Sequence, residues 1–241
     1  QQKYVEILNK DLKEANATKD KFFSIVAHDL KSPFNSLLVL TNLLIDDFDT
    51  LSREDQKKFI EQIKESSENT FALLQNLLDW ASTQMGKTKI VSERVDIAKI
   101  SDEILALLQP IARSKKISLK SEIPLDTLVY ADKNMVSTVL LNLVTNAIKF
   151  TPQFGNVSIR SAIDNKQLEI EVADSGVGIS PENLDKLFRL DQKVQTVGTA
   201  KEKGTGLGLI ICKEFIEKNN GKLWAKSIVG KGSQFYFTLP V

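Results

Sequence analysis

The sequence contains a single histidine, His28, within the stretch AHDLKSP. Asp29 follows it directly, and a carboxylate near a neutral imidazole can accept its N–H and make the other ring nitrogen a better nucleophile. Ser32 lies four residues after His28, so a helix would place both side chains on one face. One histidine excludes metal sites built from several histidines. The motif is compatible with a nucleophile, although a lone histidine in a helix is more often an ordinary surface or core residue.

A second group of polar residues lies in the stretch LNLVTNAIKFT. Asn142, Asn146 and Lys149 follow one another at spacings of four and three, so a helix would bring them to one face. Uncharged amide oxygens suit a hard cation such as Mg²⁺ that already carries phosphate oxygens. Lys149 could meet the phosphates as a point charge. Alternatively, both asparagines are satisfied by local backbone bonds.

Two glycine-containing motifs follow. In DSGVGIS, Asp174 ends the apolar stretch LEIEVA, and Gly176 and Gly178 would let the backbone approach a flat ligand. The carboxylate could accept a hydrogen bond from an exocyclic amino group such as that of adenine. An ordinary turn after a strand is the alternative.

The second motif is GTGLGL, whose glycines precede a predicted helix and could offer backbone N–H groups to phosphate. A dinucleotide fingerprint does not fit, because no strand of a βαβ unit leads directly into the motif. The stretch KVQTVGTAKEK precedes it instead, which favours a lid that covers phosphates.

The first 88 residues are predicted to form a helical hairpin. A heptad-like seam from Val5 to Val26 indicates a long helix over 2–48, and Pro33 predicts a kink beside His28. Ser52, with Asp55 three residues on, predicts the start of a second helix over 53–85. A hairpin alone cannot bury two apolar seams. Dimerisation into a four-helix bundle or packing on the second domain would bury them, and both remain open.

Residues 89–241 alternate predicted strands and helices, which indicates an α/β sandwich with helices on one face of a sheet. The whole chain is therefore expected to be an α+β protein of two domains, 1–88 and 89–241. The predicted helices span 97–113, 132–149 and 207–219. The predicted strands span 117–123, 128–131, 156–162, 167–173, 222–229 and 233–239, with hairpin turns at Asp164-Asn165 and at Gly230-Lys231-Gly232.

The composition supports a globular protein and excludes several classes. Of 241 residues, 42% are hydrophobic and 26% charged, and the net charge of +1 argues against a nucleic-acid partner. No apolar run approaches the roughly 18–20 residues of a spanning helix, so no membrane contact is expected within this sequence. A single cysteine, Cys212, fits a reducing cytoplasm. Because the sequence starts without methionine, we expect it to be part of a longer protein.

Taken together, the four motifs resemble the catalytic core of a bacterial two-component sensor histidine kinase. AHDLKSP is similar to the H box of that family, NLVTNAIKFT to its N box, DSGVGIS to its G1 box and GTGLGL to its G2 box. The resemblance implies a dimerising phosphoacceptor hairpin followed by an ATP-binding domain of the Hsp90, gyrase and MutL type. The sequence departs from the family at two places. Asp29 stands where glutamate is commoner. The F box of the family carries two phenylalanines, but Phe188 has no second one here, because Asp191 stands at that position.

This resemblance implies that ATP phosphorylates His28, with Asp29 orienting the imidazole and taking its proton. Mg²⁺ would be held by Asn146, with Asn142 in support. Asp174 would select adenine, and Ser32 would support removal of phosphate from the partner. Further nucleotide contacts are expected from Lys149, Phe150, Gly176, Gly178, Gly204, Thr205, Gly206, Leu207 and Gly208, and from either Arg189 or Lys193.

The implied partners are a second copy of the chain and a response-regulator receiver domain, in the cytoplasm. The full-length protein could carry an upstream sensor or membrane segment. Two other classes remain open: an ATPase or serine kinase with the same nucleotide domain, as in anti-sigma factors, and a catalytically silent dimeric scaffold. A phosphoacceptor hairpin argues against the first class and intact nucleotide boxes against the second.

Overall fold

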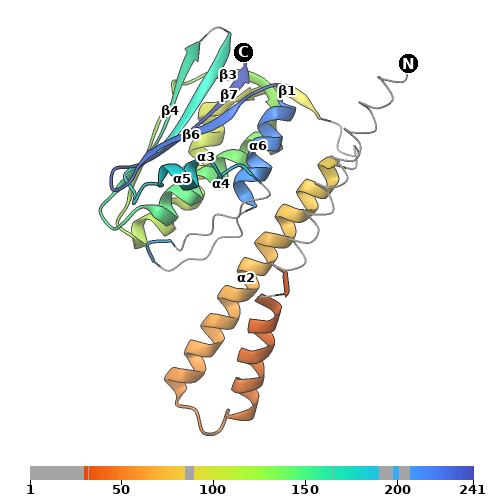
Figure 1. The fold of residues 1–241 in the computed structure, drawn as a ribbon, viewed down its shortest axis with the longest axis vertical. Helices are drawn as coiled ribbons and strands as arrows, with labels where there is room; N and C mark the ends of the chain where they lie inside the picture. Colours follow the sequence, from red (N-terminus) through yellow and green to blue (C-terminus); the bar gives the residue numbers. More distant parts are fainter. Residues whose placement is uncertain (1–29, 32, 85–89, 165, 190–197, 201–206) are drawn as a thin grey trace, which may run out of the picture. The chain divides into compact units, whose positions relative to one another are not determined.

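The chain forms two compact units, residues 1–88 and 89–241 (Figure 1). The structure, a computed structural model, describes residues 30–31, 33–84, 90–164, 166–189, 198–200 and 207–241. Within these ranges no helix combines the length and the apolar character that crossing a membrane requires. The first unit is helical and the second combines helices with a sheet.

Two helices make up the described part of the first unit. Residues 30–46 are helical, position 32 aside, and α2 covers Arg53–Gln84. The Ser52 hydroxyl accepts a hydrogen bond from the backbone N–H of Asp55 at 3.1 Å and donates one to its carboxylate at 2.6 Å, which confirms the predicted start of this helix. The Ser66 hydroxyl lies 3.3 Å from the carbonyl oxygen of Pro33. This contact joins the two helices, so the predicted hairpin is confirmed.

The hairpin leaves large apolar side chains uncovered on both helices. Ile60 and Leu74 of α2 are 54% and 41% exposed. The other exposed apolar side chains of the two helices are Phe34, Leu38, Val39, Leu43, Ile45, Phe71 and Leu78. Within the described residues, one hairpin therefore does not bury the apolar side chains of both helices.

The second unit is built on a five-stranded mixed sheet in the order β2-β4-β5-β7-β6. Strand β2 pairs parallel to β4, and all other neighbours are antiparallel. The strands are β2 (Ser118–Glu122), β4 (Asn156–Asp164), β5 (Gln167–Asp174), β6 (Leu223–Ile228) and β7 (Gly232–Pro240). Asp164 pairs with Gln167 and so belongs to β4, although the sequence analysis placed it in the turn.

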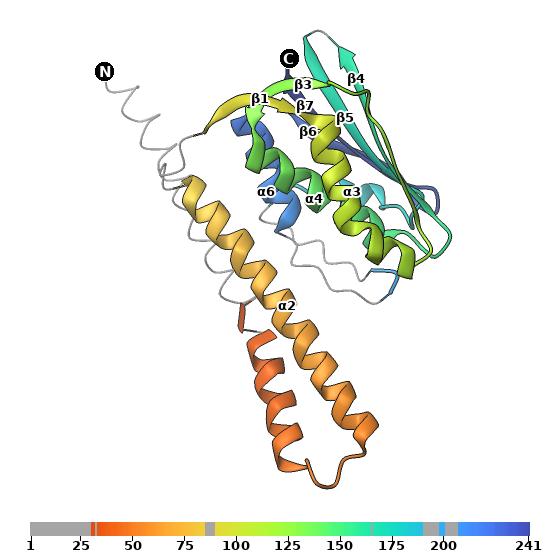
Figure 2. The same ribbon diagram turned by 180° about the vertical axis from the view of Figure 1, so that it is seen from behind.

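Three helices cover one face of this sheet, as Figures 1 and 2 show from opposite sides. They are α3 (Ile97–Ser114), α4 (Lys133–Phe150) and α6 (Gly208–Lys218), and a short helix α5 spans Pro181–Leu184. Helix α4 is the central element of the core, because Val139, Leu140, Leu143 and Val144 are fully buried. The predicted α/β sandwich is therefore confirmed.

A strand that the sequence analysis did not predict opens this unit. Strand β1 (Ser92–Asp96) pairs antiparallel with β3 (Leu128–Asp132) in a separate two-stranded sheet. Val95 is its one buried residue, so SERVD lacks the alternating apolar pattern by which a strand is recognised. Asp96 ends the strand and caps α3, because its carboxylate accepts from the N–H groups of Ala98 and Lys99.

The start of α4 is held by Asp132. One carboxylate oxygen accepts from the N–H groups of Asn134 and Met135, which confirms the predicted cap. The other oxygen accepts from the N–H of Val91 at 3.1 Å. The buried amide of Asn219 accepts from the N–H of Asp132 itself at 2.7 Å. Segments from three parts of the sequence therefore meet where α4 begins.

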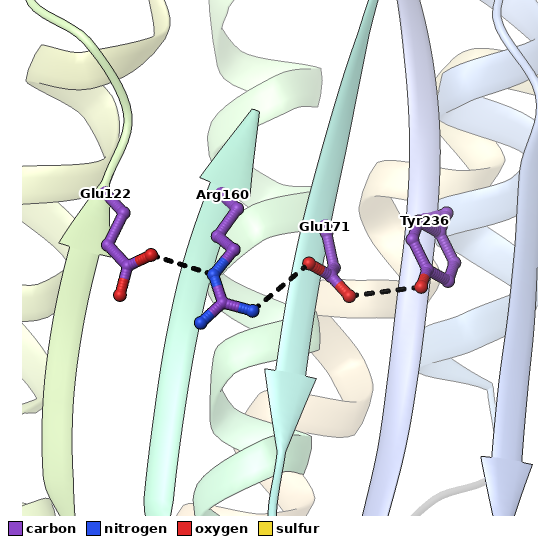
Figure 3. A network of polar contacts seen from close by, with 4 residues as sticks. All are labelled: Glu122, Arg160, Glu171 and Tyr236. Atoms are coloured by element: carbon purple, nitrogen blue, oxygen red, sulfur yellow. Dashed lines mark hydrogen bonds and ion pairs between the residues drawn. The ribbon is translucent and has the colours of Figure 1, made fainter. Parts of the chain in front are cut away.

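The opposite face of the sheet carries a polar network, shown in Figure 3. Arg160 on β4 lies 2.8 Å from the carboxylate of Glu122 on β2 and 3.8 Å from that of Glu171 on β5. The Tyr236 hydroxyl on β7 donates to Glu171 at 3.0 Å, and the Trp224 ring on β6 stacks on Tyr236 at a centroid distance of 5.4 Å. Partial burial and the neighbouring Glu171 carboxylate raise the pKa of Tyr236 to about 12. These contacts link all five strands.

One buried hydroxyl provides a test of the core. Ser101 in α3 is fully buried, and within the described ranges its Oγ is the one buried side-chain polar atom without a hydrogen-bond partner. An unsatisfied buried polar group costs about 1–3 kcal/mol. We therefore expect Ser101→Ala to raise the free energy of unfolding by about 1 kcal/mol, aided by the higher helix propensity of alanine. Calorimetric unfolding of the whole chain measures this change.

The matched control is Ser114→Ala in the same helix, where an exposed hydroxyl donates to the carbonyl oxygen of Ile111 at 2.8 Å. Its effect should stay within about 0.5 kcal/mol, as for most surface substitutions. Destabilisation by Ser101→Ala would show that the hydroxyl makes a bond in solution and would contradict the prediction.

Candidate functional site

One face of α4 carries the predicted polar residues Asn142, Asn146 and Lys149. All three are partly exposed, whereas Leu143 and Val144 on the opposite side are fully buried. The predicted helical face is therefore present. It lies within the layer of helices that covers the sheet (Figure 2).

Asn142 connects this face to the start of α6. Its Nδ2 donates to the carbonyl oxygen of Thr138 at 3.0 Å. A Cβ atom at Gly208 would lie 2.7 Å from the Asn142 Oδ1, so any larger residue at position 208 would displace the amide. Asn142 and Gly208 therefore bring the predicted N box and the end of the predicted G2 box into contact.

Asn146, one turn further on, makes no side-chain hydrogen bond with any residue that the structure describes. A half-buried amide without a protein partner is available to a ligand, and its oxygen suits a hard cation. The described ranges contain no group of three or more histidine, cysteine, aspartate or glutamate side chains that could hold a metal ion. The donor set thus fits Mg²⁺ that takes most of its ligands from phosphate oxygens and water.

Asp174 stands at the end of β5 as a fixed hydrogen-bond acceptor. Its Oδ1 accepts from the backbone N–H of Gly176 at 2.8 Å and from that of Ser233 at 3.2 Å. Its Oδ2 accepts no hydrogen bond from the described part of the chain. Burial raises the pKa of this carboxyl, and the two backbone N–H groups only partly offset that effect. The free oxygen can accept from an N–H donor of a ligand.

The turn after Asp174 needs its glycines for close packing. A Cβ atom at Gly176 would lie 2.5 Å from the carbonyl oxygen of Phe150, and one at Gly178, where φ is +71°, would overlap that of Ile228. The N–H of Val177 donates to the same Phe150 carbonyl oxygen at 3.2 Å. This bond places the turn after Asp174 against the end of α4.

The carboxyl end of α4 carries the predicted cation of the site. The Lys149 Nζ lies 4.9 Å from the centroid of the Phe150 ring, a cation–π contact that orients the ammonium group. Leu207, which precedes α6, is almost fully buried, and its carbonyl oxygen accepts from the N–H groups of Ile210 and Ile211. A carboxylate and an ammonium group therefore lie at the end of α4, and an amide and the start of α6 lie one to two turns before it. This arrangement can bind a ligand with amino and phosphate groups.

Two family models match the chain. The model described as "Histidine kinase-, DNA gyrase B-, and HSP90-like ATPase" covers residues 131–241, and "His Kinase A (phospho-acceptor) domain" covers residues 18–86. The solved catalytic domain of the histidine kinase ThkA is 30% identical, with a TM-score of 0.54; the match covers 64% of this chain and 96% of that domain. The chain belongs to the histidine kinases.

Curated relatives of this kinase are much longer proteins. The "Non-motile and phage-resistance protein" of Caulobacter vibrioides is 30% identical over 94% of this chain, which spans 28% of that protein. "Autoinducer 2 sensor kinase/phosphatase LuxQ" of Vibrio parahaemolyticus is 31% identical over 95% of this chain and 27% of LuxQ. The kinase sequence thus corresponds to about a quarter of each relative. The structure of ThkA with the response regulator protein TrrA shares the fold at a TM-score of 0.73, with 23% identity.

Several predicted site residues of the kinase lie outside the described ranges. These are His28, Asp29, Ser32, Lys193, Gly204, Thr205 and Gly206. Arg189 is described and exposed, at the end of the turns that follow α5, and Phe188 is partly buried there.

The sequence analysis missed the part that β7 plays in the site. It treated Gly230-Lys231-Gly232 only as a turn, although the N–H of Ser233 bonds Asp174. Gly232 has φ +104°, and a Cβ atom there would overlap the carbonyl oxygen of Asp174. The two glycines around Lys231 were a signal for such a close approach.

Asp174 gives a direct test of ligand recognition. Asp174→Asn keeps Oδ1 as acceptor for Gly176 and Ser233 but replaces Oδ2 with an amino group, which would face the amino group of adenine. A hydrogen bond to a charged group is worth about 1.5–3 kcal/mol, so we expect Mg²⁺–ATP affinity to fall about 10- to 100-fold. Calorimetric titration measures the affinity, and an unchanged unfolding temperature verifies the fold. Wild-type affinity in the variant would rule out this role of Asp174.

Proposed function

We propose that the chain is an ATP-dependent protein-histidine kinase that phosphorylates its own His28 and passes the phosphoryl group to an aspartate of a response regulator. The observation that carries the proposal is the position of Asp174. The turn that follows Asp174 bonds the end of α4, the helix that carries Asn146 and Lys149, and the Asp174 Oδ2 has no hydrogen-bond partner among the described residues. Family membership supports the same activity.

In this proposal the described residues bind and orient ATP. Asp174 accepts a hydrogen bond from the adenine amino group, Lys149 neutralises phosphate charge, and Asn142 lies against Gly208 at the start of α6. Asn146 would hold Mg²⁺, which when bound neutralises phosphate oxygens and orients them. The glycines of GTGLGL would cover the triphosphate with backbone N–H groups.

The chemical step assigned to the hairpin is phosphoryl transfer. A nitrogen of the His28 imidazole attacks the γ-phosphorus, the bond to the β-phosphate oxygen breaks and ADP leaves. Asp29 orients the ring and takes its proton. Because such transfer depends mainly on positioning and charge stabilisation, the nucleophile and the nucleotide can belong to separate domains.

Phosphohistidine would then donate its phosphoryl group to the carboxylate of a receiver domain. The names of two similar proteins support this step, since ThkA has been solved with a response regulator protein and LuxQ is called a sensor kinase/phosphatase. Ser32, on the predicted helix face of His28, would orient a water that hydrolyses the phosphorylated aspartate of the regulator and releases inorganic phosphate. A cytoplasmic location follows from this function, because it consumes ATP.

We also propose that the hairpin dimerises. The exposed apolar residues of the helix over 30–46 and of α2 have no cover within the described part of one hairpin. A second hairpin would bury both seams in a four-helix bundle. Each dimer would then hold two phosphoacceptor histidines and two nucleotide sites.

The nucleophile is tested by His28→Gln. We expect no stable label from γ-labelled ATP, while affinity for Mg²⁺–ATP stays within about twofold, because His28 lies outside the nucleotide-binding unit. Wild-type protein should carry a label that is labile in acid and stable in base, as a phosphoramidate is. Label that persists in the variant would refute the assignment of His28. ATP hydrolysis at the wild-type rate, with no stable label on either protein, would favour a one-site ATPase.

Mixed dimers test how the sites cooperate. Asn146→Asp adds a negative charge among phosphates, so neither it nor His28→Gln should label itself. If transfer crosses between subunits, mixtures of the two should label His28 on the Asn146→Asp chain. If transfer stays within a subunit, no label appears. Exchange with tagged wild-type subunits is the control for mixing. A strictly monomeric chain at micromolar concentration would contradict the dimer.

A further inference from the structure

The carboxyl end of α4 needs hydrogen-bond donors from outside the helix. The carbonyl oxygen of Ile148 would ordinarily accept from the residue four positions on, but that residue is Pro152, which has no N–H. Thr151 before it is extended, with φ −89° and ψ 129°, as residues before proline prefer. The last carbonyl groups of α4 are therefore left to other segments.

Lys115, the C-cap residue that directly follows α3, supplies the missing donors. Its Nζ lies 2.8 Å from the carbonyl oxygen of Ile148 and 3.2 Å from that of Lys149. A cation is favoured at this place, because the carboxyl end of a helix carries partial negative charge. The same Nζ also donates to the hydroxyl of Thr199 at 2.8 Å.

Thr199 fastens its own segment to the same end of α4. Its backbone N–H donates to the carbonyl oxygen of Lys149 at 3.0 Å. Its hydroxyl lies 2.9 Å from that oxygen and 2.9 Å from the carbonyl oxygen of Thr151, so its single proton is shared between two acceptors. Lys115, Thr199 and the backbone carbonyl groups of Ile148, Lys149 and Thr151 thus form one junction.

The junction acts on the backbone of Lys149, the residue that the proposed function assigns to phosphate charge. Lys115 and Thr199 both bond the carbonyl oxygen of Lys149. Two turns earlier on α4, Asn142 lies close to Gly208 at the start of α6. These two places are seven residues, or about 10 Å, apart along the helix axis, and Asn146 lies between them.

We infer that Lys115 and Thr199 are positioning residues for ATP. The inference rests on the proposed function. By fixing the carboxyl end of α4 before the nucleotide arrives, the junction reduces the conformational freedom that Lys149 loses on binding. Neither residue is assigned a contact with the phosphates.

The test compares Lys115→Met and Thr199→Val with matched controls. Affinity for Mg²⁺–AMPPNP and the ATP dependence of autophosphorylation are measured on the whole chain. We expect each variant to weaken binding about three- to tenfold, comparable to the loss of one hydrogen bond to a charged group. The KM for ATP should rise by the same factor, and the rate at saturating ATP should stay within about twofold. The double variant should bind no more weakly than the worse single variant, because both changes break one junction.

Two controls distinguish positioning from general destabilisation. Thr199→Ser keeps the hydroxyl and should bind as wild type does. Lys99→Met makes the same change as Lys115→Met at an exposed position of α3, where the side chain makes no hydrogen bond within the described ranges. It too should bind normally.

Any one of three results would overturn the inference. The first is wild-type affinity for AMPPNP in both test variants although their unfolding temperatures are lower. The second is an equal loss of affinity in Thr199→Ser and Thr199→Val, and the third is a loss in Lys99→Met equal to that in Lys115→Met. If wild-type protein binds AMPPNP and the test variants bind equally well, the inference fails and the proposed function stands. If wild-type protein does not bind it, both fail.

Discussion

The unpaired backbone groups at the two ends of α4 are the constraint on which the nucleotide-binding unit depends. At the amino end Asp132 satisfies the first N–H groups and also receives the N–H of Val91. At the carboxyl end Pro152 removes a donor, so Lys115 and Thr199 bond the remaining carbonyl groups. These partners come from distant parts of the sequence. The bonds that complete the helix therefore also assemble the site.

Asp174 illustrates a second requirement, the retention of a partly buried carboxylate. Burial raises its pKa, which means that ionisation is costly there, and two backbone N–H groups bonded to one oxygen offset part of that cost. Pairing of β5 with β7 sets Ser233 opposite Asp174, and the glycine at 232 permits the close approach. The sheet thus orients one carboxylate oxygen and leaves the other for a ligand.

The two units of the chain differ in how completely they bury their apolar residues. The second unit encloses its core between the sheet and three helices, with α4 at the centre. The hairpin, within its described residues, leaves large side chains of both helices exposed. The nucleotide-binding unit thus has a core of its own, whereas the described part of the hairpin does not bury both of its apolar faces.

Local patterns in the sequence were sufficient for α2, α3, α4 and α6, for most of the strands and for the polar face of α4. The cap at Asp132, the spacing of Asn142, Asn146 and Lys149, and Asp174 at a strand end each depend on residues within a few positions of one another. For the same reason the start of the second hairpin helix, at Ser52, was predictable. Asp164 was placed in the turn rather than in β4, because pairing between strands decides register and the sequence states it only approximately.

Tertiary structure alone decided the contacts between distant segments. Strand β1 exists because SERVD pairs with β3, although its own pattern is not that of a strand. Lys115 meets the end of α4 across 33 residues, and Thr199 meets Lys149 across 50. Nothing in the neighbours of Lys115 or Thr199 distinguishes them from other surface lysines and threonines. Their positions follow from which backbone groups the packed helices leave unpaired, and that is determined only once the chain is folded.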